Sequence, residues 1–307
     1  MILTVCLSPC IDVNIEVDSL GVGKSNTIIS KRIFFTGKAI NVAIGIARLN
    51  GDVFATGFMY EGNGNQFEQE LHREGVPYKF VWNEGRVREN YKFIDHRSML
   101  TEVNDVSPAV SEEKQEELIK FVKQFALASE AVVISGGLAK GMTPDYYSRI
   151  LEAIPQNIKK VVDTEGERLL CSLKYGVDLV KPNIEELERT LKKKIRTKAD
   201  MLDGCNELLK LGAKRVLLSL GKNGAIITDG TQTLYSKSVN VAMNSTVGAG
   251  DAMVAAATNA LAKGETLGKI LCCGVAAGTA AVTSPDSISF NKSKYEEVLS
   301  TLSIKEL

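Results

Sequence analysis

The chain has 307 residues, and its 37 Lys and Arg residues balance 37 Asp and Glu residues, so the formal net charge is zero. This balance argues against a nucleic-acid-binding protein, because contact with a phosphate backbone usually requires an excess of basic residues. Hydrophobic residues make up 44% and charged residues 24% of the chain, which is typical of a globular protein and excludes a disordered one. The length suits one large α/β domain or two small ones.

The apolar segments of the chain do not predict a membrane protein. The longest one, at residues 270–282, is shorter than the roughly 20 residues that a membrane helix needs. The first residues lack the pattern of a secretion signal and are typical of a strand. The six cysteines include no Cys-x-x-Cys pair, so we expect reduced thiols in a cytoplasmic protein.

The first hundred residues predict strands that are solvated on one face. After an opening strand at residues 2–7, polar and apolar residues alternate at 12–18. Residues 27–35 and 91–95 are rich in β-branched and aromatic residues, which favour strands. We therefore expect a small half-exposed β-sheet, a lid, with its strands within about residues 11–36 and 86–103.

Beyond about residue 105 the pattern changes to helices that alternate with buried strands. Apolar strands at 131–134, 160–163, 177–180 and 215–220 each follow a segment with helical periodicity. Strands that are apolar throughout and separated by helices indicate a parallel sheet covered on both faces. In such sheets ligands bind beyond the carboxyl ends of the strands, so the loops that follow strands are the candidate sites.

The strongest candidate is the segment at residues 244–251, which ends in Gly248-Ala249-Gly250-Asp251 and precedes a helix of small residues. Glycines before a helix allow several N–H groups to converge, and the helix N-terminus adds partial positive charge, so this segment suits an anion. A carboxylate at Asp251 would then accept the proton of a hydroxyl that attacks a phosphoryl group. The alternative is a glycine turn with Asp251 as an ordinary helix cap.

A second candidate lies at residues 181–186, where Lys181-Pro182-Asn183 leaves a strand and enters a helix. Asn183 and Glu186 are three residues apart on one helix face, and such a pair can hold a hydrated Mg²⁺. The alternative is a capping box, with Asn183 as the N-cap and Glu186 as its return half.

Further glycine-rich or basic turns also follow strands, at residues 36–41, 85–92, 135–141 and 219–224. The first places Lys38 and Asn41 on the first turn of a helix, and the second places Arg88 and Asn90 on one face of a strand. A later helix at residues 274–281 is so poor in side-chain bulk that a flat group can pack against it. Each feature alone is typical of a solvated charge or a turn, but together they indicate a ligand site.

Two nucleotide-binding motifs are excluded. Gly21-Val22-Gly23-Lys24-Ser25 resembles the end of a P-loop, but Asp18 stands where the first glycine is required, and the following segment is a predicted strand. A Rossmann GxGxxG motif fails because Met253 stands where its third glycine is required.

These segments, in this order, resemble the ribokinase-like (PfkB-type) carbohydrate kinase family, within it the branch of 1-phosphofructokinases, tagatose-6-phosphate kinases and minor 6-phosphofructokinases. The resemblance extends over nearly the whole chain, from LSPCID at 7–12 to GVAAGTAA at 274–281, and STVGAGD at 245–251 is the family's C-terminal signature. It implies a single domain over residues 1–307, with a three-layer α/β/α sandwich, a mainly parallel central sheet and a small β-sheet lid. It also implies ATP and Mg²⁺ as cofactors.

The resemblance implies a role for each candidate residue. The catalytic base would be Asp251, with the amides of Gly248, Ala249 and Gly250 as the anion hole. Substrate-side positions are Asp12, Gly37, Lys38, Asn41, Arg88 and Asn90; ATP-side positions are Lys181, Asn183, Ser219, Gly221 and Gly224; and Asn183 and Glu186 would organise Mg²⁺ through water.

Several positions depart from the family pattern, mostly at the sugar end. Thr36 and Ala39 replace glycines, Gly137 and Ala139 replace a serine and a proline, and Thr27 replaces a common arginine. We expect Lys24 to offset the missing arginine, and Lys24 or Lys140 to join Lys38 and Arg88 around the sugar phosphate. The nucleotide end is unchanged, so the sequence predicts kinase activity more firmly than it predicts the sugar.

Arg88 and Lys38 suit a substrate that already carries a phosphate, because a guanidinium binds two phosphate oxygens at once. We therefore expect a kinase of a ketohexose phosphate, first of all fructose 1-phosphate, with tagatose 6-phosphate and fructose 6-phosphate as alternatives. Two other classes stay open: a non-catalytic sugar-phosphate sensor and a dinucleotide-dependent oxidoreductase. The half-exposed lid also allows two copies of the chain to pair as a homodimer.

Overall fold

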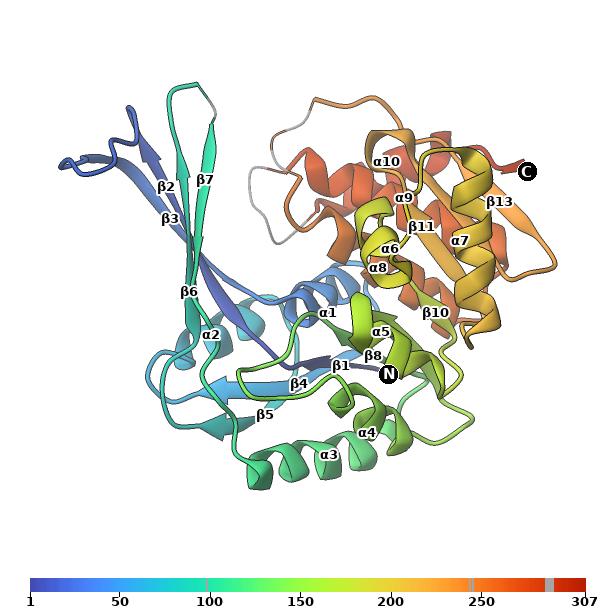
Figure 1. Cartoon of the computed structure of the whole chain (residues 1–307), viewed down its shortest axis with the longest axis horizontal. Coiled ribbons are helices and arrows are strands. Elements are labelled where there is room, and N and C mark those ends of the chain that lie inside the picture. The colour runs from blue at the N-terminus through green and yellow to red at the C-terminus, as the bar shows by residue number, and fades with distance from the viewer. Residues whose placement is uncertain (98, 243, 245, 285–289) are drawn as a thin grey trace.

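The chain forms two β-sheets in the computed structural model, which describes residues 1–97, 99–242, 244, 246–284 and 290–307. A ten-stranded sheet forms the body, and a separate four-stranded sheet projects from it (Figure 1). Ser245 of the STVGAGD signature and Ser98 of the predicted lid range lie outside the described residues.

The larger part of the body sheet is parallel. Its strands run in the order β14-β13-β12-β11-β10-β9-β8-β1-β4-β5. The parallel ones are β1 (Ile2–Cys6), β4 (Val53–Tyr60), β5 (Tyr78–Asn83), β8 (Ala131–Ser135), β9 (Lys159–Asp163), β10 (Leu179–Val180) and β11 (Val216–Ser219). Every residue of β1 and β8 is buried, as expected for central strands with both faces covered.

The other end of the sheet is antiparallel. It consists of β12 (Ala225–Thr228), β13 (Thr233–Ser236) and the C-terminal β14 (Lys305–Glu306). These three strands were not among those expected from the sequence. Strand β14 has only two residues, and Asp229-Gly230 marks a tight hairpin between β12 and β13 whose short arms carry little periodicity.

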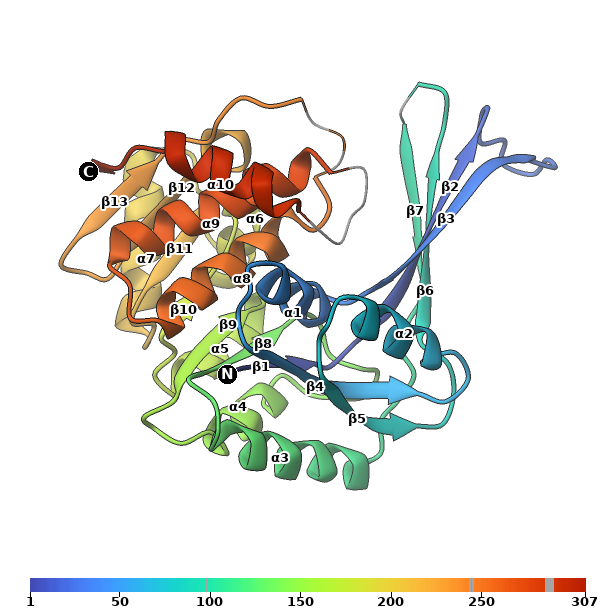
Figure 2. The same ribbon diagram turned by 180° about the vertical axis from the view of Figure 1, so that it is seen from behind.

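Helices cover both faces of the body sheet (Figure 1 and Figure 2). One layer contains α1 (Lys38–Arg48), α2 (Asn65–Arg73), α8 (Ala249–Ala262), α9 (Leu267–Val282) and α10 (Lys292–Thr301). The other contains α3 (Glu112–Ala126), α4 (Tyr146–Glu152), α5 (Gly166–Leu173), α6 (Ile184–Leu191) and α7 (Lys198–Lys210). The predicted three-layer α/β/α architecture is confirmed.

The projecting sheet, called the lid here, has the strand order β3-β2-β6-β7. Its strands are β2 (Cys10–Val17), β3 (Ile28–Thr36), β6 (Arg88–Ile94) and β7 (Leu100–Asn104). Along β2 the side chains alternate, so that Ile11, Val13 and Ile15 lie on one face while Cys10 and Asp12 lie on the other. The lid therefore has one apolar face and one polar face.

Two further features follow from the described residues. No helix among them has the length and apolarity needed to cross a membrane. The six cysteines are free thiols, and five of them are buried.

Candidate active site

A cleft of about 870 Å³ lies between the lid and the carboxyl ends of the parallel strands. Its lining includes every residue singled out from the sequence as a site residue: Asp12, Gly37, Lys38, Asn41, Arg88, Asn90, Lys181, Asn183, Glu186, Ser219, Gly221, Gly224, Gly248, Ala249, Gly250 and Asp251. Residues from widely separated parts of the chain therefore meet in one place. Lys24 and Lys140, however, are exposed and are not among the described residues that line the cleft.

The glycine turn at the start of α8 forms one wall. Gly248 is the N-cap, with a φ of 80° that favours glycine, and α8 begins at Ala249. N–H groups in the first turn of a helix have no partner within that helix, so those of Ala249 and Gly250 can face an anion. The Ala249 N–H also makes a long turn bond of 3.4 Å to the Thr246 carbonyl.

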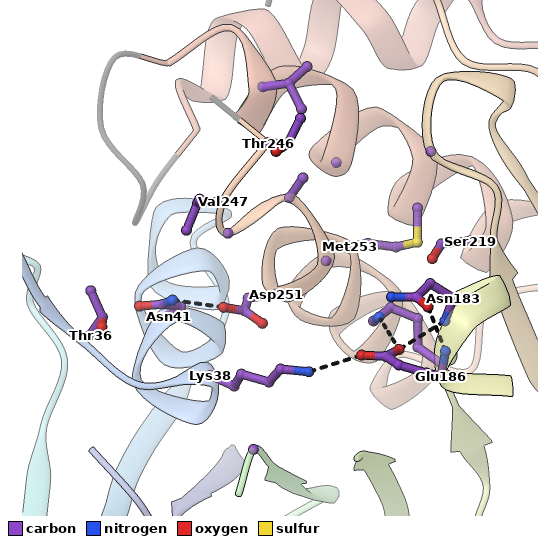
Figure 3. Close-up of a pocket in the computed structure, with 18 of the residues that line it drawn as sticks. Thr36, Lys38, Asn41, Asn183, Glu186, Ser219, Thr246, Val247, Asp251 and Met253 are labelled. Carbon is purple, nitrogen blue, oxygen red and sulfur yellow. Dashed lines mark hydrogen bonds and ion pairs between the residues drawn. The ribbon is translucent and has the colours of Figure 1, made fainter. Parts of the chain in front are cut away.

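Asp251 lies in the first turn of α8 but does not cap it, since no side chain among the described residues caps this helix. The alternative interpretation of Asp251 as an ordinary helix cap is therefore wrong. Its carboxylate points toward the neighbouring helix α1, where the Asn41 amide donates a hydrogen bond of 2.7 Å to Oδ2 (Figure 3).

The environment of Asp251 makes it a stronger base than an ordinary aspartate. Asp251 is only 8% exposed, and this burial raises its pKa from 3.8 to about 6, against the opposing effect of nearby Lys38. Asp163 also raises this pKa, while Asn41 and Lys181 lower it. A carboxylate with a pKa near 6 is ionised at neutral pH and is a competent proton acceptor.

Below Asp251, two lysines and two carboxylates alternate in a ring. Lys38 Nζ lies 3.4 Å from both Asp163 and Glu186, and Lys181 Nζ lies 3.3 Å from Asp163 and 4.0 Å from Glu186. Asp163 is 1% exposed; burial raises its pKa, but Lys181, Lys38 and the Ser135 hydroxyl together lower it below its usual value. Asp163 raises the pKa of Lys38 more strongly than burial lowers it. Lys38 is thus held as a cation on the floor of the cleft, and Lys181 forms ion pairs with the same two carboxylates.

The polar face of the lid forms the opposite wall. Lys92 Nζ lies 2.7 Å from Asp12 Oδ2, and the Asn90 amide donates to Asp12 Oδ1 at 3.2 Å. Arg88 Nη1 donates to Asn90 Oδ1 at 2.9 Å, so these four side chains form a continuous chain. Arg88 Nε is buried and has no hydrogen-bond partner among the described residues. Arg88 also lines the cleft, and Asn90 uses one of the five N–H donors of its guanidinium, so other donors can meet a ligand.

The remaining wall is lined by main chain and small side chains. Ser219 ends β11, and the 3₁₀-helix η1 (Gly221–Asn223) leads to Gly224, whose φ is 91°. A Cβ at Gly224 would lie 2.0 Å from the Ser236 carbonyl oxygen, so no larger residue fits there. Helix α9 contributes Val275, Gly278 and Thr279 to the same wall.

Comparisons with known proteins identify the family of the chain. The model of the pfkB family carbohydrate kinases matches residues 1–294. The chain belongs to this family. A 1-phosphofructokinase from Borreliella burgdorferi is 30% identical over 295 residues, covering 96% of this chain and 95% of that protein. A D-tagatose-1-phosphate kinase from Bacillus licheniformis is 33% identical over 257 residues, covering 83% and 84%.

A solved structure is also similar over nearly the whole chain. Phosphofructokinase-2 from Escherichia coli, in complex with potassium, matches with a TM-score of 0.90 and 29% identity. The match covers 97% of this chain and 98% of that chain. The expected family and fold class are thus confirmed, and the chain is a phosphotransferase of the pfkB family. Because pfkB kinases use ATP, the same match supports ATP as the cofactor.

Asn183 and Glu186 of this pfkB kinase form the capping box that the sequence left open as an alternative. Asn183 Oδ1 accepts from the Glu186 N–H at 2.8 Å, and Glu186 Oε2 accepts from the Asn183 N–H at 2.9 Å. Glu186 Oε1 remains on the cleft side, toward Lys38 (Figure 3).

This donor set decides how a metal would bind. No group of three or more His, Cys, Asp and Glu side chains among the described residues forms a metal cage. Mg²⁺ commonly keeps several waters and takes one or two carboxylates plus substrate phosphates. Glu186 Oε1 fits that mode, whereas Asn183 Oδ1 is already used by the helix.

Two residues of the pfkB site were missed from the sequence: Lys92, which lines the cleft, and Asp163, which is buried and pairs with the cleft residues Lys38 and Lys181. Asp163 ends β9, and its position after a buried strand was a usable signal, since parallel strands end at the ligand side of the sheet. Lys92 stands two residues after Asn90 on β6 and so shares its face. Nothing local in the sequence indicates that it pairs with Asp12.

The departures from the family pattern have different structural consequences. Gly137 lies on open space, so nothing in the cleft opposes a side chain there. Thr36 is buried and donates from Oγ1 to the Cys10 carbonyl at 3.2 Å, and Ala39 is fully buried on α1. The small-residue helix α9 serves two purposes: Gly274 packs on Met253 of α8, while Gly278 borders the cleft.

Proposed function

We propose that the protein transfers the γ-phosphoryl group of ATP to fructose 1-phosphate, giving fructose 1,6-bisphosphate and ADP. The observation that carries this proposal is Asp251, a buried carboxylate with a pKa of about 6 between a glycine-rich helix start and a cationic lid. A carboxylate in this position suits the acceptance of a proton from a hydroxyl as it attacks a phosphoryl group.

The transfer step makes and breaks one bond to phosphorus. The hydroxyl oxygen of the sugar forms a bond to the γ-phosphorus, while the bond from that phosphorus to the β–γ bridging oxygen breaks. ADP leaves with the electron pair, and the hydroxyl proton passes to the Asp251 carboxylate. Asn41 holds Asp251 from the α1 side at 2.7 Å, which fixes the direction in which the free oxygen points.

Charge on the transferred group is balanced by fixed donors. The amides of Gly248, Ala249 and Gly250 form the proposed anion hole, and one such donor is typically worth about 10²–10³-fold in rate. Lys38 and Lys181 add two positive charges on the floor of the cleft. A bound Mg²⁺, held through water by Glu186, would neutralise charge on the ATP phosphates.

The nucleotide lies against the wall formed by Ser219, Gly221 and Gly224, and its phosphates lie near Lys181 and Asn183. The sugar lies on the lid side of the cleft, near Asp12, Gly37 and Asn90. This arrangement places Asp251 between ATP, the phosphoryl donor, and the sugar hydroxyl that accepts the phosphoryl group. The lid covers the sugar side, which excludes water that would otherwise accept the phosphoryl group.

The identity of the sugar follows from Arg88 and from the relatives. Arg88 is suited to a phosphate already present on the substrate, because it lines the cleft and a guanidinium can bind two phosphate oxygens at once. The names of the Borreliella and Bacillus proteins both place that phosphate on C1 of a ketohexose. This favours fructose 1-phosphate, with tagatose 1-phosphate as a closer second candidate than the tagatose 6-phosphate or fructose 6-phosphate expected from the sequence.

We further propose that two copies of the chain pair through the apolar face of the lid. On this face, the cross-strand neighbours Ile33, Val13, Tyr91 and Val103 form one row across all four strands. The two residues at the ends of the row, Ile33 and Val103, are 47% and 56% exposed. Apolar surface of this kind is usually covered by a partner. Ile33→Lys should convert a dimer to a monomer in sedimentation analysis; an unchanged mass would refute the interface. The free thiols support a cytoplasmic location.

An assay of ADP release tests the function. Purified protein with ATP and Mg²⁺ is given fructose 1-phosphate, tagatose 1-phosphate, tagatose 6-phosphate, fructose 6-phosphate, fructose and ribose. The proposal expects the highest kcat/KM for fructose 1-phosphate and little turnover of the two free sugars. Preference for a free sugar would contradict it.

A further inference from the structure

The polar face of the lid carries more charged groups than phosphate binding by Arg88 alone requires. The register places Cys10 opposite Arg88, Asp12 opposite Asn90, and Asn14 opposite Lys92 on the paired strands β2 and β6. Arg88, Asn90 and Lys92 are spaced by two residues, so all three face the cleft, and all three line it. Arg88 is at the end nearest the body, and Lys92 is farther out.

Lys92 and Asp12 form a buried ion pair. Their side chains are 9% and 7% exposed, and Nζ lies 2.7 Å from Oδ2. The other oxygen of Asp12 accepts from Asn90, so both carboxylate oxygens have a donor. Asn90, a neutral amide, separates this pair from Arg88.

The sum of charges on this surface depends on Lys92. With Lys92 present, the charges of Lys92 and Asp12 cancel, and the positive charge of Arg88 is left for a ligand. Without Lys92, the buried Asp12 carboxylate would cancel the charge of Arg88 and would repel an incoming phosphate. Glu102, opposite Lys92 on β7, also lines the cleft, but it is exposed, so solvent screens its charge.

We propose that Lys92 determines specificity for phosphorylated sugars by neutralising Asp12, so that the lid presents the uncompensated charge of Arg88 to the substrate phosphate. This inference rests on the proposed function. It assigns Lys92 to positioning and charge balance and not to direct contact with phosphate, because its ammonium is already bound by Asp12. Stability alone is a weak reason for such a pair, since a buried ion pair often contributes little compared with apolar residues of similar size.

The test compares Lys92→Met, Lys92→Arg and the double variant Asp12→Asn/Lys92→Met with wild type, and Lys120→Met on the exposed surface of α3 serves as the matched control. Lys92→Met should raise the KM for fructose 1-phosphate by about 10- to 100-fold and change the KM for ATP by less than about twofold. Lys92→Arg keeps the charge and should stay within about threefold of wild type. Lys120→Met should match wild type.

Two further measurements separate charge balance from structure. The double variant restores a neutral pair, so it should bind fructose 1-phosphate more tightly than Lys92→Met does, although Asp12 itself is changed. The inhibition constant for free fructose, which has no phosphate, should change by less than about twofold in Lys92→Met. A merely structural role would weaken fructose and fructose 1-phosphate alike, and a direct phosphate contact would give no recovery in the double variant.

The outcomes distinguish this inference from the proposed function. If the wild type phosphorylates fructose 1-phosphate, three results overturn the inference alone. The first is an unchanged KM for fructose 1-phosphate in Lys92→Met, and the second is an equal loss of affinity for fructose and for fructose 1-phosphate in that variant. The third is a double variant that binds fructose 1-phosphate no more tightly than Lys92→Met does. Failure of the wild type to phosphorylate any ketohexose phosphate overturns the proposed function and, with it, the inference.

Discussion

Replacement of Asp251 by Asn separates the catalytic and the structural consequences of one buried carboxylate. The pKa of Asp251 is raised from 3.8 to about 6, chiefly by burial. At 1.36 kcal/mol per pKa unit, this shift corresponds to a cost of about 3 kcal/mol for keeping the folded protein ionised at pH 7. A neutral amide avoids most of that cost.

The structure also offers the new amide a partner. Asn41 donates to Asp251, while its own Oδ1 is buried without a hydrogen-bond partner among the described residues. An asparagine at position 251 can accept from Asn41 and donate back to that oxygen. We therefore expect Asp251→Asn to be more stable than the wild type, with a free energy of unfolding about 1–3 kcal/mol higher at pH 7. We expect its kcat to fall by about 10²–10⁴-fold.

The pH dependence gives the sign of the effect. Because the folded pKa of Asp251 lies above the unfolded one, protonation favours the folded state, and wild-type stability is lost as pH rises from about 4 through 6. The advantage of Asp251→Asn should therefore be full at pH 7 and should vanish below about pH 4. Urea unfolding of both proteins at pH 4, 5, 6 and 7 measures this difference.

The matched control is Asp203→Asn, the same change at an exposed position of α7. It should leave both stability and kcat close to those of wild type. An Asp251→Asn variant that is less stable than wild type at pH 7, or that keeps near-normal turnover, would refute the reasoning about this carboxylate.

Further predictions follow from the same geometry. Arg88→Ala should raise the KM for the sugar phosphate about 10- to 100-fold and leave the KM for ATP nearly unchanged in steady-state assays, and an unchanged sugar KM would remove Arg88 from the site. Wild-type kcat/KM should fall about tenfold per pH unit below pH 6 as Asp251 binds a proton, whereas a flat profile to pH 5 would argue against Asp251 as the base. Gly248→Ala should cost about 1–2 kcal/mol of stability, because φ is 80° there, and should lower kcat; normal stability in urea unfolding would show that the strain is relieved. Asp163→Asn should destabilise the protein by about 3 kcal/mol at pH 7, since it removes a carboxylate partner from the buried Lys181 and the half-buried Lys38, and a neutral effect in the same measurement would contradict the ring.

Local sequence patterns predicted the α/β body and its ligand edge well. Asp251, Lys38 and Asn183 each stand just after a turn that follows a strand or opens a helix, so a motif of a few residues is enough to find them. The structure brings them into one cleft because parallel strands end on the same side of the sheet.

Long-range pairings could not be predicted in this way. Asp163 acquires its importance from Lys38 and Lys181, which come from distant parts of the chain, and Lys92 acquires its importance from Asp12 across β2 and β6. Lys24 and Lys140 were expected to help bind phosphate, but both are exposed outside the cleft. A basic residue that is close to a motif in the sequence need not point toward the same site in the folded chain.

Identification of the product tests the central claim most directly. Wild-type protein, ATP, Mg²⁺ and fructose 1-phosphate are incubated, and ³¹P NMR follows the phosphorus signals, with Asp251→Asn in a parallel tube. The account predicts that fructose 1,6-bisphosphate and ADP appear in equal amounts with wild type and at a rate at least about 100-fold lower with the variant. ADP and inorganic phosphate without a sugar bisphosphate, or equal rates in both tubes, would contradict it.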